Sequence, residues 1–240
     1  MKIDIQSIPS PPNPNVLSNL SVVVIDVLRA TSVMVYAMSQ GAREIIPVAT
    51  VEEAFQRAKT FPLGTTFLGG ERNSQKIEGF DFGNSPREYG AEKVKDKRLI
   101  LTTTNGTKAF HSVSSGKEIM VGSFFNLRAA AQRCFELNRD LLIFPSGNGG
   151  IFSLEDTVCG GMLIDLILKM KKKYVMLTDA SQSAHILYQR FREDLLEAFQ
   201  LSNHGKDLID LGLEDDLRYC AQVDITEIVP TFKGGAIRTD

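Results

Sequence analysis

Residues 22–32 read V-V-V-I-D-V-L-R-A-T-S, and this stretch decides the fold that we predict. Its first part, Val22–Ile25, is an unbroken β-branched run, which is typical of a strand buried on both faces. The segment Thr31–Ser39 then has the pattern of a helix, and Gly41 ends it. A buried strand that leads directly into a helix indicates an α/β protein.

The alternation of strand and helix continues along the chain. We expect further strands at Glu44–Val48, Thr65–Leu68, Leu99–Leu101, Ile119–Val121, Leu141–Phe144 and Ile225–Val229. We expect further helices at Val51–Lys59, Asn126–Glu136, Glu155–Lys173 and Ala184–Phe199. Residues 203–205 have turn character, and residues 233–238 are expected either to close over something or to fray.

The offsets between these elements suggest a repeat. Thr31 and Thr107 lie 76 residues apart, as do Gly70 and Ser146. We therefore predict two α/β units in tandem, residues 21–95 and 97–170, that share one core in a single domain of residues 1–240. An α/β segment over residues 171–240 would follow them. The alternative is that any α/β chain shows some recurrence of this kind.

Composition narrows the classes of protein that are possible. The chain has 240 residues, of which 43% are apolar, which is enough for one large domain with a buried core. A formal net charge of −2 gives no basic field, so we expect no nucleic-acid partner. We also expect no secretion signal and no membrane association. The three cysteines are odd in number and widely spaced, which favours buried, reduced thiols in a cytoplasmic protein.

Asp26 and Arg29 lie where the first buried strand meets a helix, and open α/β sheets bind ligands at such strand ends. The helix start, with Thr31 and Ser32, offers backbone N–H groups and a partial positive charge that suit phosphate. Arg29 adds a planar fork for an oxyanion, and Asp26 would be a magnesium ligand or a nucleophile. The alternative is that Asp26 only caps the turn and that Arg29 is a solvated charge.

A second group of polar residues follows the strand near residue 68. A pair of glycines allows close backbone approach to a ligand, and Glu71 and Arg72 then place an acid and a base on one tight turn. These two side chains suit a metal ion and an anion. Asn84 and Ser85 precede a proline, which indicates a helix start that can bind an anion, although a simple cap is the commoner structure.

The residues Thr104, Asn105, Gly106 and Thr107 are the repeat counterpart of the Asp26 loop, and they make a neutral anion nest before a helix. Ser146 and Asn148 form another polar turn after a strand. Adjacent acids at 155 and 156 can simply complement a helix dipole, but carboxylate oxygens also suit Mg²⁺. The four acids that we expect to converge on one cleft and to hold Mg²⁺ are Asp26, Glu71, Glu155 and Asp156.

Two common phosphatase signatures are absent. The aspartyl-phosphate type needs a second acid two residues after the first, where this chain has Leu28. The cysteine type needs five residues between its cysteine and arginine, whereas four residues separate Cys134 from Arg139. Three histidines lack a partner at metal spacing and are expected to have surface or core roles: His111, His185 and His204.

Five short motifs occur in order: D-V-L-R-A-T-S at 26–32, G-E-R at 70–72, G-F-D-F-G-N-S-P at 79–86, T-T-N-G-T at 103–107 and S-L-E-D at 153–156. Together they resemble the 2-phosphosulfolactate phosphatase family. The resemblance implies a three-layer α/β/α fold with a mixed sheet, in agreement with the repeat. It also implies magnesium-dependent hydrolysis of 2-phospho-3-sulfolactate to 3-sulfolactate and phosphate, which in that family is a step of coenzyme M biosynthesis.

This substrate carries a phosphate, a carboxylate and a sulfonate, and Arg29, Arg72 and the helix starts can each meet one of these groups. The expected catalytic residues are Asp26, Glu71 and Arg29. We hypothesise direct attack by a metal-bound water with Asp26 or Glu71 as the base, and an aspartyl-phosphate on Asp26 is the rival mechanism. The alternative functions are a broader phosphatase for small phosphorylated hydroxy acids and a non-catalytic anion-binding protein. A homodimer is compatible with the sequence.

Overall fold

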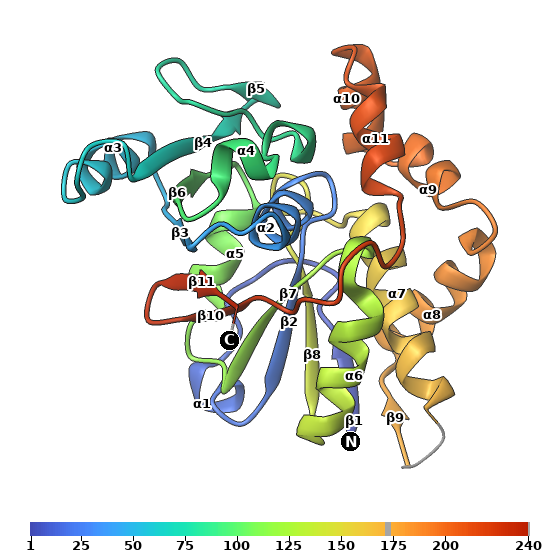
Figure 1. The fold of residues 1–240 in the computed structure, drawn as a ribbon. Coiled ribbons are helices and arrows are strands. Elements are labelled where there is room, and N and C mark those ends of the chain that lie inside the picture. Colours follow the sequence, from blue (N-terminus) through green and yellow to red (C-terminus); the bar gives the residue numbers. More distant parts are fainter. Residues whose placement is uncertain (171–173, 240) are drawn as a thin grey trace.

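The computed structural model describes residues 1–170 and 174–239, and within these ranges the fold is α/β with one eleven-stranded mixed sheet (Figure 1). The strands are β1 (Lys2–Ile5), β2 (Ser21–Ile25), β3 (Glu44–Pro47), β4 (Thr66–Arg72), β5 (Gln75–Lys76), β6 (Arg98–Thr102), β7 (Glu118–Gly122), β8 (Leu141–Pro145), β9 (Met176–Leu177), β10 (Thr231–Lys233) and β11 (Ala236–Arg238). The helices are α1 (Pro14–Leu17), α2 (Ala30–Ser39), α3 (Val51–Ala58), α4 (Ala91–Val94), α5 (Gly106–Ser112), α6 (Leu127–Leu137), α7 (Leu154–Lys169), α8 (Asp179–Phe191), α9 (Leu195–Leu201), α10 (Asn203–Asp210) and α11 (Glu214–Cys220), with 3₁₀ helices η1 (Pro86–Glu88) and η2 (Phe124–Asn126).

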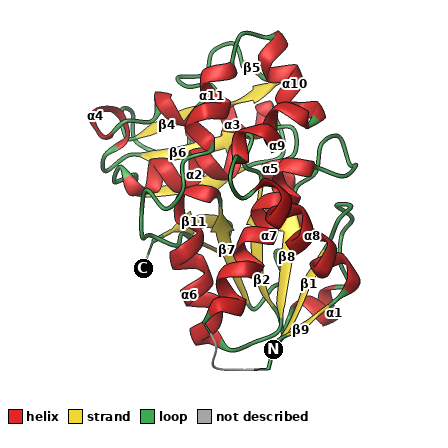
Figure 2. Cartoon of the chain, turned by 90° about the vertical axis from the view of Figure 1, so that its right-hand side faces the viewer, coloured by secondary structure: helices red, strands yellow, loops and turns green. Residues whose placement is uncertain are grey.

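The sheet consists of two parallel blocks joined by a hairpin. Its strand order is β5-β4-β6-β3-β11-β10-β7-β2-β8-β1-β9. The hairpin β10–β11 pairs antiparallel with β7 on one side and with β3 on the other. Three successive antiparallel pairings make the block β3-β6-β4 run opposite to the block β7-β2-β8. Figures 1 and 2 show the two blocks crossing at a large angle.

The connection between the blocks bears on the repeat hypothesis. The order β2-α2-β3-α3-β4 in the chain is followed by β6-α5-β7-α6-β8. Each block takes its central strand from one unit and two flanking strands from the other, because β2 lies between β7 and β8 and β6 lies between β3 and β4. The two expected units are therefore intertwined and not merely adjacent. Common ancestry of residues 21–95 and 97–170 stays a prediction that superposition of the two units would test.

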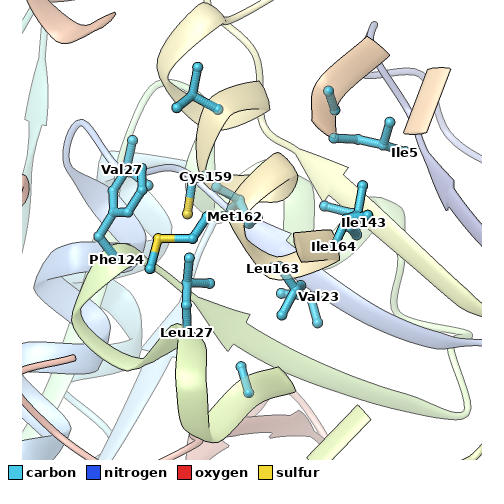
Figure 3. Packing of buried hydrophobic residues seen from close by; sticks show 14 of the residues in the cluster. Ile5, Val23, Val27, Phe124, Leu127, Ile143, Cys159, Met162, Leu163 and Ile164 are labelled. Atoms are coloured by element: carbon cyan, nitrogen blue, oxygen red, sulfur yellow. The ribbon is translucent and has the colours of Figure 1, made fainter. Parts of the chain in front are cut away.

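The core explains why three layers form. Along β2, Val23 and Ile25 face a cluster that includes α6 and α7, whereas Val22 and Val24 face a second cluster that includes α2 and α5. A strand buried on both faces in this way has no solvated side, as its β-branched run predicted. Figure 3 shows the first cluster, in which Val23 and Ile143 pack against residues of α7 such as Leu163.

The second face of the β3-β6-β4 block is covered by α3, whose Ala54 packs with Ile46 and Ile100. The central cluster under α2 and α5 contains residues of both blocks, among them Val24 and Leu99. The expected three-layer α/β/α architecture with a mixed sheet is confirmed. The three cysteines are free and buried, and burial raises the pKa of Cys134 and Cys220 to about 12.

Four expectations about the C-terminal third were wrong. The expected helix Ala184–Phe199 is divided, because α8 ends at Phe191 and α9 begins at Leu195 with Asp194 as its cap. Residues 225–229 form no strand, because the backbone there hydrogen-bonds to η2 and to the Asn126 side chain instead of to a neighbouring strand. Residues 203–205 begin helix α10, with Ser202 as its cap. Residues 233–238 belong to the hairpin β10–β11 inside the sheet and are neither a frayed end nor a covering segment. The end of the expected helix Glu155–Lys173, residues 171–173, lies outside the described residues.

No helix in the described ranges is long and apolar enough to cross a bilayer.

A buried carboxylate holds the C-terminal hairpin to the sheet. Glu44 on β3 receives a hydrogen bond from Arg98 Nε on β6 at 2.5 Å and a second one from Arg238 on β11. Burial alone would raise the pKa of Glu44, but the hydrogen bonds from the two guanidinium groups outweigh it and hold the pKa below the ordinary value of 4.5. Ionised Glu44 therefore stabilises the junction of the two blocks.

Replacing Glu44 with Gln is expected to lower the free energy of unfolding at pH 7 by about 1–3 kcal/mol, because two charge-assisted hydrogen bonds are lost. Since the pKa of the folded state is lowered, this contribution is present above pH 4.5 and declines as the pH falls through the folded pKa. Urea unfolding at pH 7 and below pH 4.5 should thus give a difference that shrinks in acid. The exposed Glu52→Gln variant on α3 serves as the control, and a Glu44→Gln effect equal at both pH values would contradict the assignment.

Candidate active site

A cavity of about 320 Å³ lies where the loops after β2, β4, β6 and β8 meet. These are the first and third strands of the two expected units, and the crossing of the two blocks brings their carboxyl ends to one place. Ligands of α/β proteins bind at such ends. The described residues that line the cavity are Asp26, Leu28, Arg29, Glu71, Asn73, Ser74, Asn84, Thr103, Thr104, Asn105, Asn148, His204, Asp207 and Leu211.

Asp26 is fixed at the end of β2 by its own helix start. Its backbone N–H donates to Thr31 Oγ1 at 2.9 Å, and the Ala30 N–H donates to Asp26 Oδ1 at 3.4 Å. Burial raises the pKa of Asp26 to about 6, and the negative charge of Glu71 adds to this effect. Hydrogen bonding to Ser146 and the charge of His204 act in the opposite direction. Asp26 is thus a carboxyl group whose pKa lies near neutrality inside a cavity, which suits proton transfer.

Gly106 explains how the two counterpart loops approach each other. A Cβ atom at this position would lie 2.5 Å from the Ala30 Cβ and 2.6 Å from Asp26 Oδ2. Only glycine therefore fits between the Asp26 loop and the start of α5. The predicted pairing of the loop at 26–32 with the loop at 102–107 is present as direct packing.

Glu71 sits at the end of β4, and three donors hold its carboxylate. Thr104 N–H donates to Oε1 at 2.7 Å, Ser74 N–H donates to Oε2 at 2.9 Å, and the Thr104 hydroxyl donates to Oε2 at 3.2 Å. Asn73 and Ser74 both have positive φ, so they form the two-residue turn that links β4 to β5. This turn carries the Ser74 donor and places it beside the cavity.

Arg29 is buried and paired, so the alternative of a solvated charge is wrong. Its Nη1 donates to Asp216 Oδ2 at 2.5 Å, and its Nη2 donates to the Ser74 carbonyl at 2.9 Å. The side chains of Arg29 and Asp216 are each only 3% exposed. Part of the expected oxyanion fork is therefore occupied by the protein itself, while Nε has no hydrogen-bond partner among the residues that the structure describes.

The four expected metal ligands do not form one cluster. Asp26 and Glu71 line the cavity, but Asp156 lies beneath the loop, where its Oδ1 accepts the Val27 N–H at 2.8 Å. Burial raises the pKa of Asp156 well above its ordinary value, and the charges of Glu155 and Asp26 add to the rise. Glu155 lines a neighbouring pocket that shares Asn148 and His204 with the cavity. Across residues 1–170 and 174–239, no group of three or more His, Cys, Asp or Glu side chains is arranged to hold a metal ion.

Five residues expected to bind substrate support the cavity instead of lining it. The Ser32 hydroxyl donates to the Val27 carbonyl, and Thr31 accepts the Asp26 N–H. The Thr107 hydroxyl bonds to the Thr103 backbone, and the Arg72 guanidinium donates to the Thr102 hydroxyl. The Ser85 hydroxyl donates to Asp216 Oδ1 at 2.6 Å. Local hydrogen bonding therefore takes up these side chains: Thr31, Ser32, Arg72, Ser85 and Thr107.

The remaining expected residues do meet at the cavity. Asn84, Thr104, Asn105 and Asn148 line it directly, and they provide neutral donors and acceptors around the two acids. Ser146 lines an adjoining pocket together with Thr104 and Asn105, and its side chain bonds to Asp26. Gly106 contributes by its lack of a side chain.

The sequence interpretation missed the contribution of the C-terminal helices. His204 and Asp207 lie three residues apart on α10, so they share one face of the helix, and Leu211 follows it. Asp216 on α11 holds Arg29 from behind the cavity. The run of acids at 214–216 was visible in the sequence, but nothing local ties it to a residue near position 29.

Comparison with known proteins agrees with this geometry. The profile of a family described as 2-phosphosulpholactate phosphatase matches residues 7–235. The chain belongs to this family. The matched range includes all the strands whose ends form the cavity, and also α10 and α11. Members of the family are phosphoric monoester hydrolases by name.

Individual relatives cover nearly the whole chain. A probable 2-phosphosulfolactate phosphatase of Clostridium novyi is 45% identical over 232 residues, which cover 97% of each chain. Similar proteins of the same description come from Clostridium acetobutylicum, 42% identical over 92% of this chain and 93% of the relative, and from Caldanaerobacter subterraneus, 42% identical over 93% and 92%. The sequence similarity to these relatives therefore covers both the residues of the cavity and the C-terminal helices.

Proposed function

We propose that the protein is a phosphatase that hydrolyses 2-phospho-3-sulfolactate to 3-sulfolactate and phosphate. The observation that carries this proposal is the cavity in which Asp26, Glu71 and Arg29 meet, within a chain whose family is named for that reaction. A carboxylate with a raised pKa, a second carboxylate held by backbone N–H groups and a buried guanidinium are the parts that hydrolysis of a phosphate ester needs.

The charge of the cavity supports a requirement for a divalent cation. Among the described residues that line it, the acids Asp26, Glu71 and Asp207 face one guanidinium and one imidazole. Such a surface repels an ester that carries a phosphate, a carboxylate and a sulfonate unless a cation lies between them. Mg²⁺ commonly takes one or two protein carboxylates and completes its shell with water and substrate phosphate, so a site without three clustered acids fits it.

Asp26 and Glu71 are the residues that would hold Mg²⁺. Bound there, the ion neutralises phosphate charge and polarises the ester. Glu155 and Asp156 fit this role less well: Glu155 belongs to the neighbouring pocket, and Asp156 is buried beneath the loop and bonded to the Val27 N–H.

The side chains that line the cavity have separate roles in the proposed reaction. Burial raises the pKa of Asp26 to about 6 in the metal-free protein, whereas the Glu71 carboxylate is fixed in place by three hydrogen-bond donors. We therefore assign proton removal from the attacking water to Asp26. The Arg29 guanidinium and the amides of Asn84 and Asn148 bind the oxyanions and keep the ester in place for attack. Single turnover stopped with acid tests this route, since phosphate covalently attached to Asp26 would indicate an aspartyl-phosphate instead.

The test of the function is release of phosphate from a panel of esters, with Mg²⁺ present and with the metal chelated. We expect kcat/KM for 2-phospho-3-sulfolactate to exceed that for phospholactate and phosphoglycolate by about tenfold or more, because loss of one hydrogen-bonded charged group costs about 1.5–3 kcal/mol. Chelation should abolish turnover, and added Mg²⁺ should restore it. Equal rates across the panel would favour the broader phosphatase, and no turnover with Mg²⁺ would favour an anion-binding protein. The coenzyme M pathway, a cytoplasmic location and a homodimer stay predictions.

A further inference from the structure

Arg29 is held from two sides by segments that are distant in the sequence. Asp216, on α11, accepts from Nη1 at 2.5 Å, and the Ser74 carbonyl, in the β4–β5 turn, accepts from Nη2 at 2.9 Å. A planar guanidinium clamped at two nitrogens has little freedom to rotate. Figure 1 shows α11 and β5, the strand that follows this turn, at the same end of the molecule.

The clamp leaves donors of Arg29 unused. A guanidinium has five N–H donors, of which the clamp uses two, and the buried Nε has no acceptor among residues 1–170 and 174–239. Leaving a buried donor unsatisfied costs about 1–3 kcal/mol, more for a charged group, so such an atom calls for an explanation. Because Arg29 lines the cavity, an oxyanion bound there can accept from N–H donors of the guanidinium that the clamp does not use.

Asp216 is itself fixed at both of its oxygens. Oδ1 accepts from the Ser85 hydroxyl at 2.6 Å, and Oδ2 accepts from Arg29. Asp216 is 2% exposed and is not among the residues that line the cavity. It can therefore act on a bound anion only through Arg29, and Ser85 in turn aligns Asp216.

We propose that Asp216 is a positioning residue, which with Ser85 holds the Arg29 guanidinium so that its remaining N–H donors can bind an oxyanion of the substrate. This role rests on the proposed function in one respect, namely that the cavity binds a phosphate ester. With this role, α11 contributes to anion binding although it lies outside both expected repeat units.

The competing explanation is that Asp216 only neutralises a buried charge. The test replaces Asp216 with Asn in the full-length protein and compares it with Asp215→Asn. Asp215 is the neighbouring residue, and it pairs with Arg87 at 3.0 Å in an exposed ion pair, so the control makes the same change of charge on the same helix. The readouts are KM and kcat for the ester, the Kd of inorganic phosphate with Mg²⁺ present, and urea unfolding.

Asp216→Asn is expected to raise KM and the Kd of phosphate by about 10- to 100-fold, because small displacements of a binding group have effects of this size. Asp216→Glu should recover part of the loss, and Asp215→Asn should stay within about twofold of the wild type. If Asp216→Asn does not fold, Ser85→Ala provides the measurement, with an expected rise of about 2- to 10-fold from one lost hydrogen bond.

Unchanged KM and phosphate Kd in folded Asp216→Asn, with only a lower free energy of unfolding, would overturn the positioning role. The proposed function can fail separately: a wild type that binds phosphate but releases none from the ester refutes the reaction, while the Kd comparison still decides the role of Asp216. A wild type that binds neither phosphate nor ester overturns both.

Discussion

Asp26→Asn is expected to lower kcat by about 10²- to 10⁴-fold, which is the contribution of a positioned acid or base. The substitution keeps the size of the side chain and keeps an oxygen that can accept the Ala30 N–H, so the loop after β2 should retain its shape. What it removes is the carboxylate that can take a proton. The measurement is steady-state phosphate release from the ester at saturating Mg²⁺.

The stability of Asp26→Asn shows whether activity is lost because the carboxylate is absent or because the fold is disrupted. Since burial raises the pKa of Asp26 to about 6, the ionised form is disfavoured in the folded state of the metal-free protein. Metal-free Asp26→Asn should therefore unfold at a urea concentration no lower than the wild type at pH 8. Asp210→Asn, an exposed change on α10, is the control and should leave kcat unaltered. Near-normal kcat in Asp26→Asn would remove Asp26 from the mechanism.

Arg29→Met is expected to lower the free energy of unfolding by about 3–5 kcal/mol, because it leaves Asp216 buried without its partner. Removal of both charges should be milder, so the double variant Arg29→Met with Asp216→Leu is expected to regain part of the loss. The control is Arg87→Met, which breaks an exposed ion pair and should cost less than about 1 kcal/mol.

Urea unfolding at pH 7 measures all three variants of this series. An Arg29→Met effect no larger than that of Arg87→Met would mean that the Arg29–Asp216 pair is solvated in the protein. Phosphate binding provides a second check, since neither Arg29 variant retains the guanidinium, and the double variant should stay deficient in binding even where its stability recovers.

The strands of the two blocks were predictable because their patterns are local. The β-branched run at 22–25 is a strand buried on both faces, and Thr50 caps α3 by accepting the Glu53 N–H. The short strands β1, β5 and β9–β11 were missed, because two to four residues carry no periodicity. Residues 225–229 include three β-branched apolar residues, but their backbone bonds to η2 and to the Asn126 side chain instead of to a strand.

The candidate site likewise has parts that local sequence patterns predict and parts that they do not. Asp26, Glu71 and the loop at 103–107 follow strands, so their meeting could be expected from the rule that strand ends bind ligands. The pair Arg29–Asp216 joins residues 187 positions apart, and no local pattern predicts it. His204 was assigned a surface or core role because it has no partner at metal spacing, yet α10 brings it to the cavity. The sequence also did not predict that the hydroxyls of Thr31, Ser32 and Ser85 form hydrogen bonds within the protein and so are not placed to bind substrate.

The hairpin β10–β11 has a consequence for the order in which the protein folds. It pairs Thr231 with Met120 and Ile237 with Ile45, and it is the only link in the described sheet between the two blocks. The two blocks of the sheet are therefore joined by strand pairing only through residues that lie far apart in the sequence. Contacts between such residues are slow to form, because a long loop must close first. Joining of the two blocks is thus expected to be a late step of folding.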